Sequence, residues 1–388
     1  MRKCLIFLVL VLLLSLCSCK PPVVSKNEYG YYRQDFYGYL DTDSFIVVEY
    51  DKSKTTEDQV KADVSKIEDI LIDIEINYSK EQTIWMKLKN IEKSTVMLVN
   101  ENSGISPVEV SSNFINLLKH ANYMSNKTNG GFDVTVGPLS KLWNIPARTE
   151  YCNMLGDTNC EIPSNEQIQE TLKFVDYSKI IINEAESTVY LPEKGMALDF
   201  GAIAKGYAAD MVMNHLKKDA YTYISVNLGG NVIVSGKSYL YNEYTNSCDI
   251  VPIGIENPYY ARFRSLTVMN VNESDITVVA SGVSKRYIEV WDEEKIDYVK
   301  YHHIISPITG YPYENEIETI TIIGSSSMEA DALSTGVFSL GLEGGIKFLK
   351  ENNIKGIFIT KDMKIYIVGN INYTLKDGVE EVYTIINK

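Results

Sequence analysis

Two side chains that could bind a metal, Asp331 and Thr335, lie four residues apart in the segment 328–345, MEADALSTGVFSLGLEGG. Apolar spacing predicts a helix over about 328–340, so both side chains project from one helix face. A carboxylate and a hydroxyl in this arrangement suit Mg²⁺, which takes few protein ligands and completes its shell with water and phosphates. The spacing alone favours a structural explanation, in which Asp331 interacts with the helix dipole and Thr335 bonds back to a carbonyl.

A second candidate is the segment 197–210, ALDFGAIAKGYAAD. Apolar residues at helical spacing predict a helix that begins near Gly201 or Ala202. Free backbone groups at this end, together with the charge of Lys205, could bind an anion. Asp199 would bind a donor from a ligand, or it would cap the helix.

Two further segments carry residue types that could do chemistry. Residues 301–312, YHHIISPITGYP, place two adjacent histidines before a turn. Such a histidine can donate a charged hydrogen bond to phosphate or shuttle a proton, although by itself the pattern favours a surface or hydrogen-bonded structural histidine. Residues 129–144, NGGFDVTVGPLSKLWN, combine a glycine turn with an aromatic residue and a β-like run, VTV. The turn could let backbone approach a ligand whose planar ring the aromatic flanks, although simple packing explains the same residues.

Two other patterns are predicted to be structural. GGNVIVSGKS, residues 229–238, resembles a phosphate-binding loop, but its glycine spacing is one residue too long and no helix follows. We therefore predict a tight turn at Gly229 and Gly230. Cys152 and Cys160 flank a polar loop and form either a disulfide or two free thiols.

The order of predicted elements indicates an α+β fold with mixed and antiparallel sheets, because long strand runs occur without strict βαβ alternation. Strands are predicted at residues 44–50, 94–99, 179–183, 188–191, 221–228, 231–236, 265–271, 276–282, 319–324, 356–360 and 364–369. Helices are predicted at about 56–76, 107–127, 163–172, 203–217, 328–340 and 344–352.

The N-terminus reads as a secretory signal, with two basic residues followed by an apolar run from Leu5 to Leu16. The tetrapeptide ending at Cys19 resembles a bacterial lipobox, so we expect a signal peptide over 1–18 and lipid attached to Cys19. Ordinary secretion is the alternative. Residues 19–39 are expected to be a polar tether, and 40–388 one domain of two closely packed lobes.

The charge of the chain excludes one class of partner. Removing residues 1–18 leaves 35 basic and 51 acidic residues, a net charge of −16. Such an acidic chain is a poor nucleic-acid binder, and a phosphate-bearing substrate would need local lysines or a divalent cation.

Six motifs in this order, with the lipobox, closely resemble the ApbE family of bacterial flavin transferases. They are GGFDVTVGPLSKLW, ALDFGAIAKGYAAD, VNLGGNV, VVASG, HHIISPITGYP and EADALSTGVFSLG, within about residues 40–370. The resemblance implies an enzyme that binds FAD and Mg²⁺, cleaves the pyrophosphate, passes FMN to a threonine of a membrane redox subunit and releases AMP. The suspected acceptors are subunits of NADH:quinone reductase or Rnf-type complexes.

The resemblance also assigns roles to individual residues. It implies a metal site at the carbonyl of Ala202 and the side chains of Asp331 and Thr335. It implies a catalytic role for Asp331 and for His303, which matches the family's histidine beside the diphosphate. The implied FAD contacts are Leu40, Gly131, Phe132, Asp133, Asp199, Lys205 and Ile305.

Three positions differ from the family pattern. Leu40-Asp41-Thr42 replaces Met-Gly-Thr, Ser306 replaces the aspartate of His-Ile-Ile-Asp-Pro, and no aromatic is evident soon after Ser79. Two competing functions follow: an FAD pyrophosphatase that produces FMN and AMP, and a flavin-binding lipoprotein without catalysis.

Overall fold

The computed structural model describes residues 28–149, 152, 160–240, 251–259, 265–271, 275–292 and 296–388. The expected signal peptide, Cys19 and Cys248 lie outside these residues. Within them, no helix has both the length and the apolar character needed to cross a membrane.

A nine-stranded sheet runs through the molecule in the order β1-β2-β6-β7-β10-β13-β14-β15-β17. Neighbouring strands are antiparallel except β15 and β17, which are parallel. The strands are β1 (Tyr29–Tyr39), β2 (Thr42–Asp51), β6 (Tyr221–Leu228), β7 (Asn231–Gly236), β10 (Ile276–Gly282), β13 (Ile317–Gly324), β14 (Lys355–Thr360), β15 (Lys364–Val368) and β17 (Thr384–Asn387).

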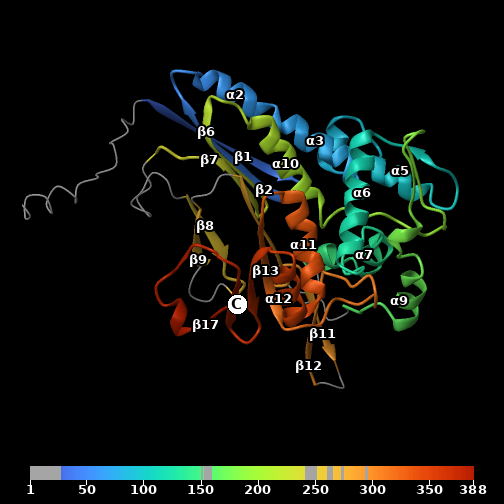
Figure 1. Ribbon diagram of the computed structural model, residues 1–388. Coiled ribbons are helices and arrows are strands. Elements are labelled where there is room, and N and C mark those ends of the chain that lie inside the picture. Colours follow the sequence, from blue (N-terminus) through green and yellow to red (C-terminus); the bar gives the residue numbers. More distant parts are fainter. Residues whose placement is uncertain are drawn as a thin grey trace, which may run out of the picture.

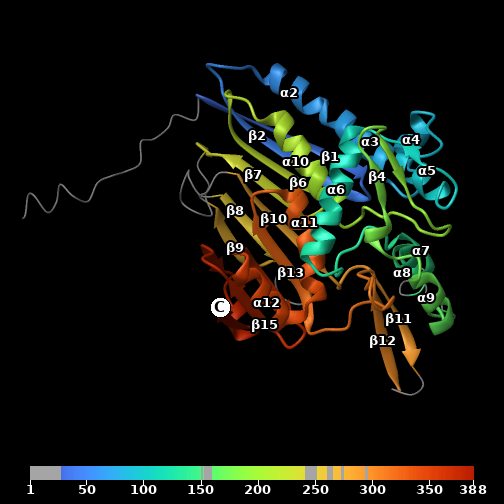
Figure 2. The ribbon, with the colours of Figure 1, turned by 45° about the vertical axis from the view of Figure 1, so that its right-hand side comes forward.

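Helices pack on one face of this sheet and share the main hydrophobic core with it. Figures 1 and 2 show α10 and α11 lying along that face, with α6 beside them. The helices are α2 (Glu57–Ser65), α3 (Ile67–Tyr78), α4 (Ile84–Leu88), α5 (Thr95–Glu101), α6 (Ser112–Lys127), α7 (Gly137–Trp143), α8 (Ile145–Thr149), α9 (Asn165–Leu172), α10 (Ala204–Leu216), α11 (Ser327–Ser339) and α12 (Gly341–Glu351).

The opposite face of the sheet has its own core. On β14, Phe358 points into the main core while Ile357 and Ile359 point into the second, as the two-residue period of a strand requires. A three-stranded sheet of β8 (Val251–Glu256), β9 (Ser265–Val271) and β16 (Tyr373–Leu375) supplies residues to this second core. The main sheet is therefore buried on both faces from β6 to β15.

Smaller elements complete the helical side. β3 (Val108–Glu109), β5 (Thr188–Tyr190) and β4 (Ile181–Asn183) form a small sheet, and β11 (Tyr287–Asp292) pairs with β12 (Asp297–His302). A third hydrophobic cluster contains Leu139, Trp143, Ile145, Ile168 and Ile305, from α7, α8, α9 and the loop after β12.

The α+β prediction is confirmed, and so is the tight turn at Gly229 and Gly230, whose φ angles of 58° and 96° join β6 to β7. The strand predicted at 94–99 is wrong. The hydroxyl of Ser94 accepts a hydrogen bond from Met97 N and caps α5, which buries Val96 and Val99 one helical turn apart.

Two further differences concern the expected tether and the β-like run at 134–136. Residues 29–39, expected to be part of a tether, form β1 and pair with β2 along nearly their whole length. Phe36 and Tyr39 are buried there, so the folded domain begins by Tyr29 and not at Leu40. The β-like run at 134–136 is a turn, in which only Val136 makes a bridge, to Ala197.

Candidate functional site

The segment 197–210 and the helix of Asp331 and Thr335 pack directly against each other as α10 and α11. Asp210 joins them: its carboxylate accepts hydrogen bonds from Ser326 Oγ, Ser327 N and Met328 N, which caps the N-terminus of α11. α10 begins at Ala204, later than predicted, because a turn over 201–203 precedes it. Ala202 lies in that turn.

Gly206 is the close-contact point between the two helices. A Cβ atom there would lie 2.1 Å from Ser327 O and 2.8 Å from the Cβ of Asp331. Its backbone N donates to Asp331 Oδ2 at 2.9 Å, and Asp331 is 4% exposed. One carboxylate oxygen of Asp331 is thus held in place by the neighbouring helix.

The structural explanation holds in part for Asp331 and fails for Thr335. Asp331 lies beyond the first turn of its own helix α11, but it accepts a bond from Gly206 N in the first turn of α10. Ser334 and Ser339 of α11 bond back to carbonyls of their own helix, but among the described residues the Thr335 hydroxyl has no such bond. No group of three or more His, Cys, Asp or Glu residues forms a metal site in the described chain. A site here would combine one carboxylate with hydroxyl and carbonyl oxygens.

Asp199, predicted to contact FAD or cap the helix, is bound inside the protein. Its Oδ2 pairs with Lys80 Nζ at 2.8 Å, and its Oδ1 accepts from Gly201 N at 2.8 Å. Burial would raise the pKa of Asp199, but Lys80, Gly201 N and the hydroxyl of Ser140 together lower it. Sequence reasoning missed Lys80, because the pairing spans 119 residues.

Lys205, near the start of α10, is one of the charged groups that act on His303, which follows β12. The ammonium group of Lys205 makes one long contact, 3.4 Å to Gly201 O, and among the described residues it has no ion pair. Burial lowers the pKa of His303 to about 3, with further lowering from Arg286, His302 and Lys205. His303 is therefore neutral at physiological pH.

The proton of the neutral His303 ring lies on Nδ1. That atom is 3.2 Å from the carbonyl oxygen of Arg286, which can only accept a hydrogen bond. The other ring nitrogen, Nε2, then has a free lone pair. The neutral ring does not supply the charged hydrogen bond to phosphate that was one of the two roles predicted. Its Nε2 can accept a hydrogen bond from a hydroxyl, and the negative charge of a bound diphosphate would raise the pKa of the ring toward proton acceptance.

The adjacent histidine has a structural role. His302 is 5% exposed, its Nδ1 accepts from Ile304 N and its Nε2 donates to Tyr313 O at 2.8 Å. Burial lowers its pKa to about 4. Both ring nitrogens are used within the fold.

Ser306, which replaces an aspartate of the family pattern, supports the turn after the histidines. Its hydroxyl accepts hydrogen bonds from Ile308 N at 3.2 Å and Thr309 N at 3.1 Å. A carboxylate at this position could accept the same bonds. Ile305, a predicted FAD contact, is 8% exposed and packs in the third hydrophobic cluster.

The glycine turn 129–133 lies against the C-terminal end of α11. A Cβ on Gly131 would lie 1.9 Å from Ser339 Oγ, and Tyr313 donates its hydroxyl proton to Gly131 O at 3.0 Å.

Phe132 is 3% exposed and belongs to the main core. The carboxylate of Asp133 accepts bonds from Thr135 N, Thr135 Oγ1 and Tyr177 N, and burial raises its pKa. Asp133 holds the loop, and a ligand here would meet mainly backbone.

Leu40 occupies the two-residue turn between β1 and β2. Leu40 and Asp41 both have φ of 54°, a left-handed conformation that favours glycine, and Leu40 N donates to Glu75 Oε1 at 2.8 Å. Trp85 stacks on Tyr39 beside this turn, with ring centres 4.2 Å apart. The aromatic beside this turn is thus Trp85, six residues after Ser79.

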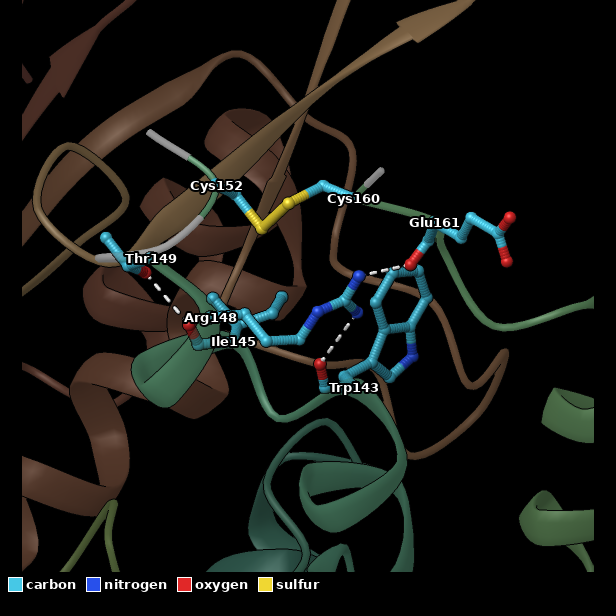
Figure 3. The surroundings of a disulfide bond; sticks show 7 residues. All are labelled: Trp143, Ile145, Arg148, Thr149, Cys152, Cys160 and Glu161. Carbon is cyan, nitrogen blue, oxygen red and sulfur yellow. Dashed lines mark hydrogen bonds between the residues drawn. A yellow bond between two sulfur atoms is a disulfide. The ribbon is translucent and has the colours of Figure 1, made fainter. Parts of the chain in front are cut away.

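Cys152 and Cys160 form a disulfide, which decides between the two readings left open by the sequence. Figure 3 shows the guanidinium of Arg148 near this bond, where it donates to Glu161 O and Trp143 O. The disulfide is thus tied to α7, the helix that also carries Ser140.

A family model described as the ApbE family matches residues 59–358. The chain belongs to the ApbE family. ApbE relatives named FAD:protein FMN transferase include one from Klebsiella pneumoniae (strain 342), 33% identical over 279 residues, which cover 72% of this chain and 78% of the relative. One from Treponema pallidum (strain Nichols) is 31% identical over 283 residues, which cover 71% and 73%.

Solved ApbE structures share the fold. The flavin transferase ApbE from Vibrio cholerae has a TM-score of 0.68 at 20% identity, over 91% of this chain and 99% of that one. The ApbE protein of Thermotoga maritima has a TM-score of 0.68 at 25% identity, over the same shares. The predicted ApbE resemblance and α+β fold are confirmed.

Proposed function

We propose that this chain is an Mg²⁺-dependent FAD:protein FMN transferase. It cleaves the FAD pyrophosphate, attaches FMN through a phosphoester to a threonine of a membrane redox subunit, and releases AMP. Family membership supports the reaction class. The proposal is carried to this chain by two groups. Lys205, on α10, has no ion pair among the described residues, and the neutral ring of His303 has a nitrogen that no other group uses.

The donors on α10 and α11 fit magnesium. Gly206 N binds one carboxylate oxygen of Asp331, which leaves the other oxygen for a metal, and within the described chain the Thr335 hydroxyl makes no bond back to its own helix. Ala202 is half-buried in the turn before α10, where its carbonyl oxygen would be a third ligand. These are hard oxygen donors, few in number, as magnesium prefers when phosphates and water supply the rest. When bound, the ion would offset phosphate charge.

The residues of the chain then have distinct roles. Lys205 offsets the charge of the diphosphate, which the acidic chain would otherwise repel. His303 Nε2 accepts the proton of the threonine hydroxyl, whose oxygen attacks the FMN phosphorus in line. The bond from that phosphorus to the bridging oxygen breaks, and AMP leaves with that oxygen. We also propose that lipid on Cys19 holds the enzyme at a bacterial membrane, facing the periplasm or exterior, within reach of its acceptor.

The proposal is tested with the full-length chain, FAD, Mg²⁺ and the flavin-accepting subunit of an NADH:quinone reductase. Mass spectrometry should find FMN on a threonine of the subunit and an equal amount of AMP. FMN and AMP in solution without transfer would support the pyrophosphatase, and no AMP would support the non-catalytic flavin carrier.

Variants of α11 test the metal assignment. Asp331→Ala should lower AMP release at least a hundredfold and remove the shift in melting temperature caused by Mg²⁺ with FAD. Thr335→Val should weaken both effects. Glu329→Ala is the matched control, because Glu329 lies on the same helix but pairs with Lys127 at the surface. Unchanged AMP release from Asp331→Ala would contradict the metal assignment.

A further inference from the structure

The hairpin of β11 and β12 extends from the body of the protein (Figures 1 and 2). Its two strands pair with each other in an antiparallel register from Tyr287 opposite His302 to Asp292 opposite Asp297. Among the described residues it is a separate two-stranded sheet. It is the kind of element that needs support from elsewhere, since an isolated two-stranded hairpin is marginally stable in water.

One face of the hairpin provides that support. Ile288 is fully buried, and Tyr301, opposite it in the register, stacks on Trp143 with ring centres 5.5 Å apart. Helix α8 also contacts β11. The base of the hairpin is thereby fixed to the third hydrophobic cluster.

The other face is exposed and aromatic. Trp291 lies opposite Tyr298, with ring centres 5.3 Å apart in an edge-on arrangement. Trp291 is 49% exposed and Tyr298 is 61% exposed. Tryptophan and tyrosine are the side chains that most often dominate the binding energy of protein interfaces. As a cross-strand pair the two rings stabilise the hairpin, yet they also leave a large aromatic surface in water.

Both ends of the hairpin meet at the candidate site. Arg286 immediately precedes β11 and His303 immediately follows β12. His303 N donates to Arg286 O at 3.1 Å, and the imidazole Nδ1 lies 3.2 Å from the same oxygen. Tyr298 is five residues from His303 along an extended strand, roughly 16 Å, a span that one docked protein can cover.

The sequence of the hairpin also indicates the charge of the partner. Among the described side chains of the hairpin, Glu289 and Asp297 are exposed carboxylates, while Lys300 pairs with Glu318. A complementary surface would carry basic side chains around an apolar centre.

We propose that the exposed face of the β11–β12 hairpin docks the protein that receives FMN, through a basic and apolar surface beside the receiving hydroxyl. This inference rests on the proposed transferase function and adds the place where the acceptor binds. The chain then recognises its acceptor as a folded protein, and not only through the residues around the modified threonine.

The test compares two acceptors with the full-length Trp291→Ala/Tyr298→Ala variant. One is the folded flavin-accepting subunit of an NADH:quinone reductase, and the other is a short synthetic peptide containing its modified threonine. The variant should raise KM for the folded subunit at least tenfold, leave kcat unchanged, and transfer FMN to the peptide at the wild-type rate. Trp291→Phe/Tyr298→Phe should restore most of the affinity.

Tyr31→Ala is the matched control, because Tyr31 is 51% exposed but lies on β1. Equal losses with both acceptors would mean that the hairpin only positions His303, and unchanged KM would mean that the acceptor binds elsewhere; either result overturns the docking proposal. Failure of the wild-type chain to transfer FMN to both acceptors would instead contradict the proposed function, and the docking proposal with it.

Discussion

At the scale of single residues, the site is defined by which charges are already paired. The family resemblance implies that Asp199 and Asp133 contact FAD, yet both carboxylates are bound by groups of the protein itself. Lys205 and His303 are the groups left available to a substrate, a cation and a neutral base. A phosphoryl transfer needs this combination, because the protein contributes mainly charge stabilisation and positioning.

The Lys80–Asp199 pair leads to a stability prediction. Lys80→Met should lower the free energy of unfolding at pH 7 by about 1 to 2 kcal/mol, since Asp199 is left charged and buried without its partner. The value is smaller than for a fully buried pair because the Lys80 side chain is 42% exposed. Urea unfolding with a Lys80→Met/Asp199→Asn double-mutant cycle would measure it.

The pH dependence of that loss follows from the sign of the shift. The pKa of Asp199 is lowered in the folded protein. Its contribution is therefore present above the unfolded pKa of about 3.9 and disappears as pH falls through the folded value. The difference between wild type and Lys80→Met should shrink as the pH is lowered below about 4. A difference that grows in acid would contradict the pairing.

At the scale of elements, α10 and α11 act as one unit. Asp210 of α10 caps α11, and Gly206 lets the helices approach until its N–H reaches Asp331. The small residues of the segment 197–210 thus serve helix contact, which keeps the carboxylate of Asp331 in one orientation. Their position near phosphate remains part of the functional proposal.

Gly206→Ala tests this close approach. The added Cβ would meet the backbone of Ser327, so the helices must separate, at a cost of about 1 to 3 kcal/mol. We expect a lower melting temperature and a higher Mg²⁺ concentration for half-maximal AMP release. Gly324→Ala is the control, because the nearest atom to its Cβ would be 3.9 Å away and stability should change by less than about 0.5 kcal/mol. Similar effects of the two substitutions would argue against a special contact at Gly206.

At the scale of the whole molecule, the helices, the two-faced sheet and the small β8–β9–β16 sheet form continuous cores on both sides of β2, β6 and β7. The first strand, β1, extends this sheet on one side. Its residues form an integral strand and not the expected tether, so the folded unit begins before Leu40. A domain cut at Leu40 would lack this strand.

Two truncations test that extent. A chain starting at residue 28 should keep the stability of the longer protein. A chain starting at Leu40 should lose at least about 5 kcal/mol, because Phe36 and Tyr39 leave the core and β2 loses its partner. Thermal melts and recovery of soluble protein would measure the difference, and equal stability would show that β1 is dispensable.

The family, the α+β class, most elements and the segments that carry the chemistry could all be predicted from the sequence. These depend on local patterns: the helical spacing of 328–340, the glycine turn at 229–230 and the order of motifs along the chain. The prediction of a strand at 94–99 was wrong, because Ser94 caps a helix that contains the apolar run. The prediction of a tether was also wrong, because the polar residues of β1 pair with β2.

The tertiary structure sets which site residues are paired inside the protein and which are left for a ligand. The Lys80–Asp199 pair, the bond from Gly206 to Asp331 and the influence of Lys205 on His303 join positions about a hundred residues or more apart. It also closed the Cys152–Cys160 disulfide and made His302 structural while His303 kept a free nitrogen. Burial and pairing set each group's charge, and both arise from long-range packing that residue types and spacing do not contain.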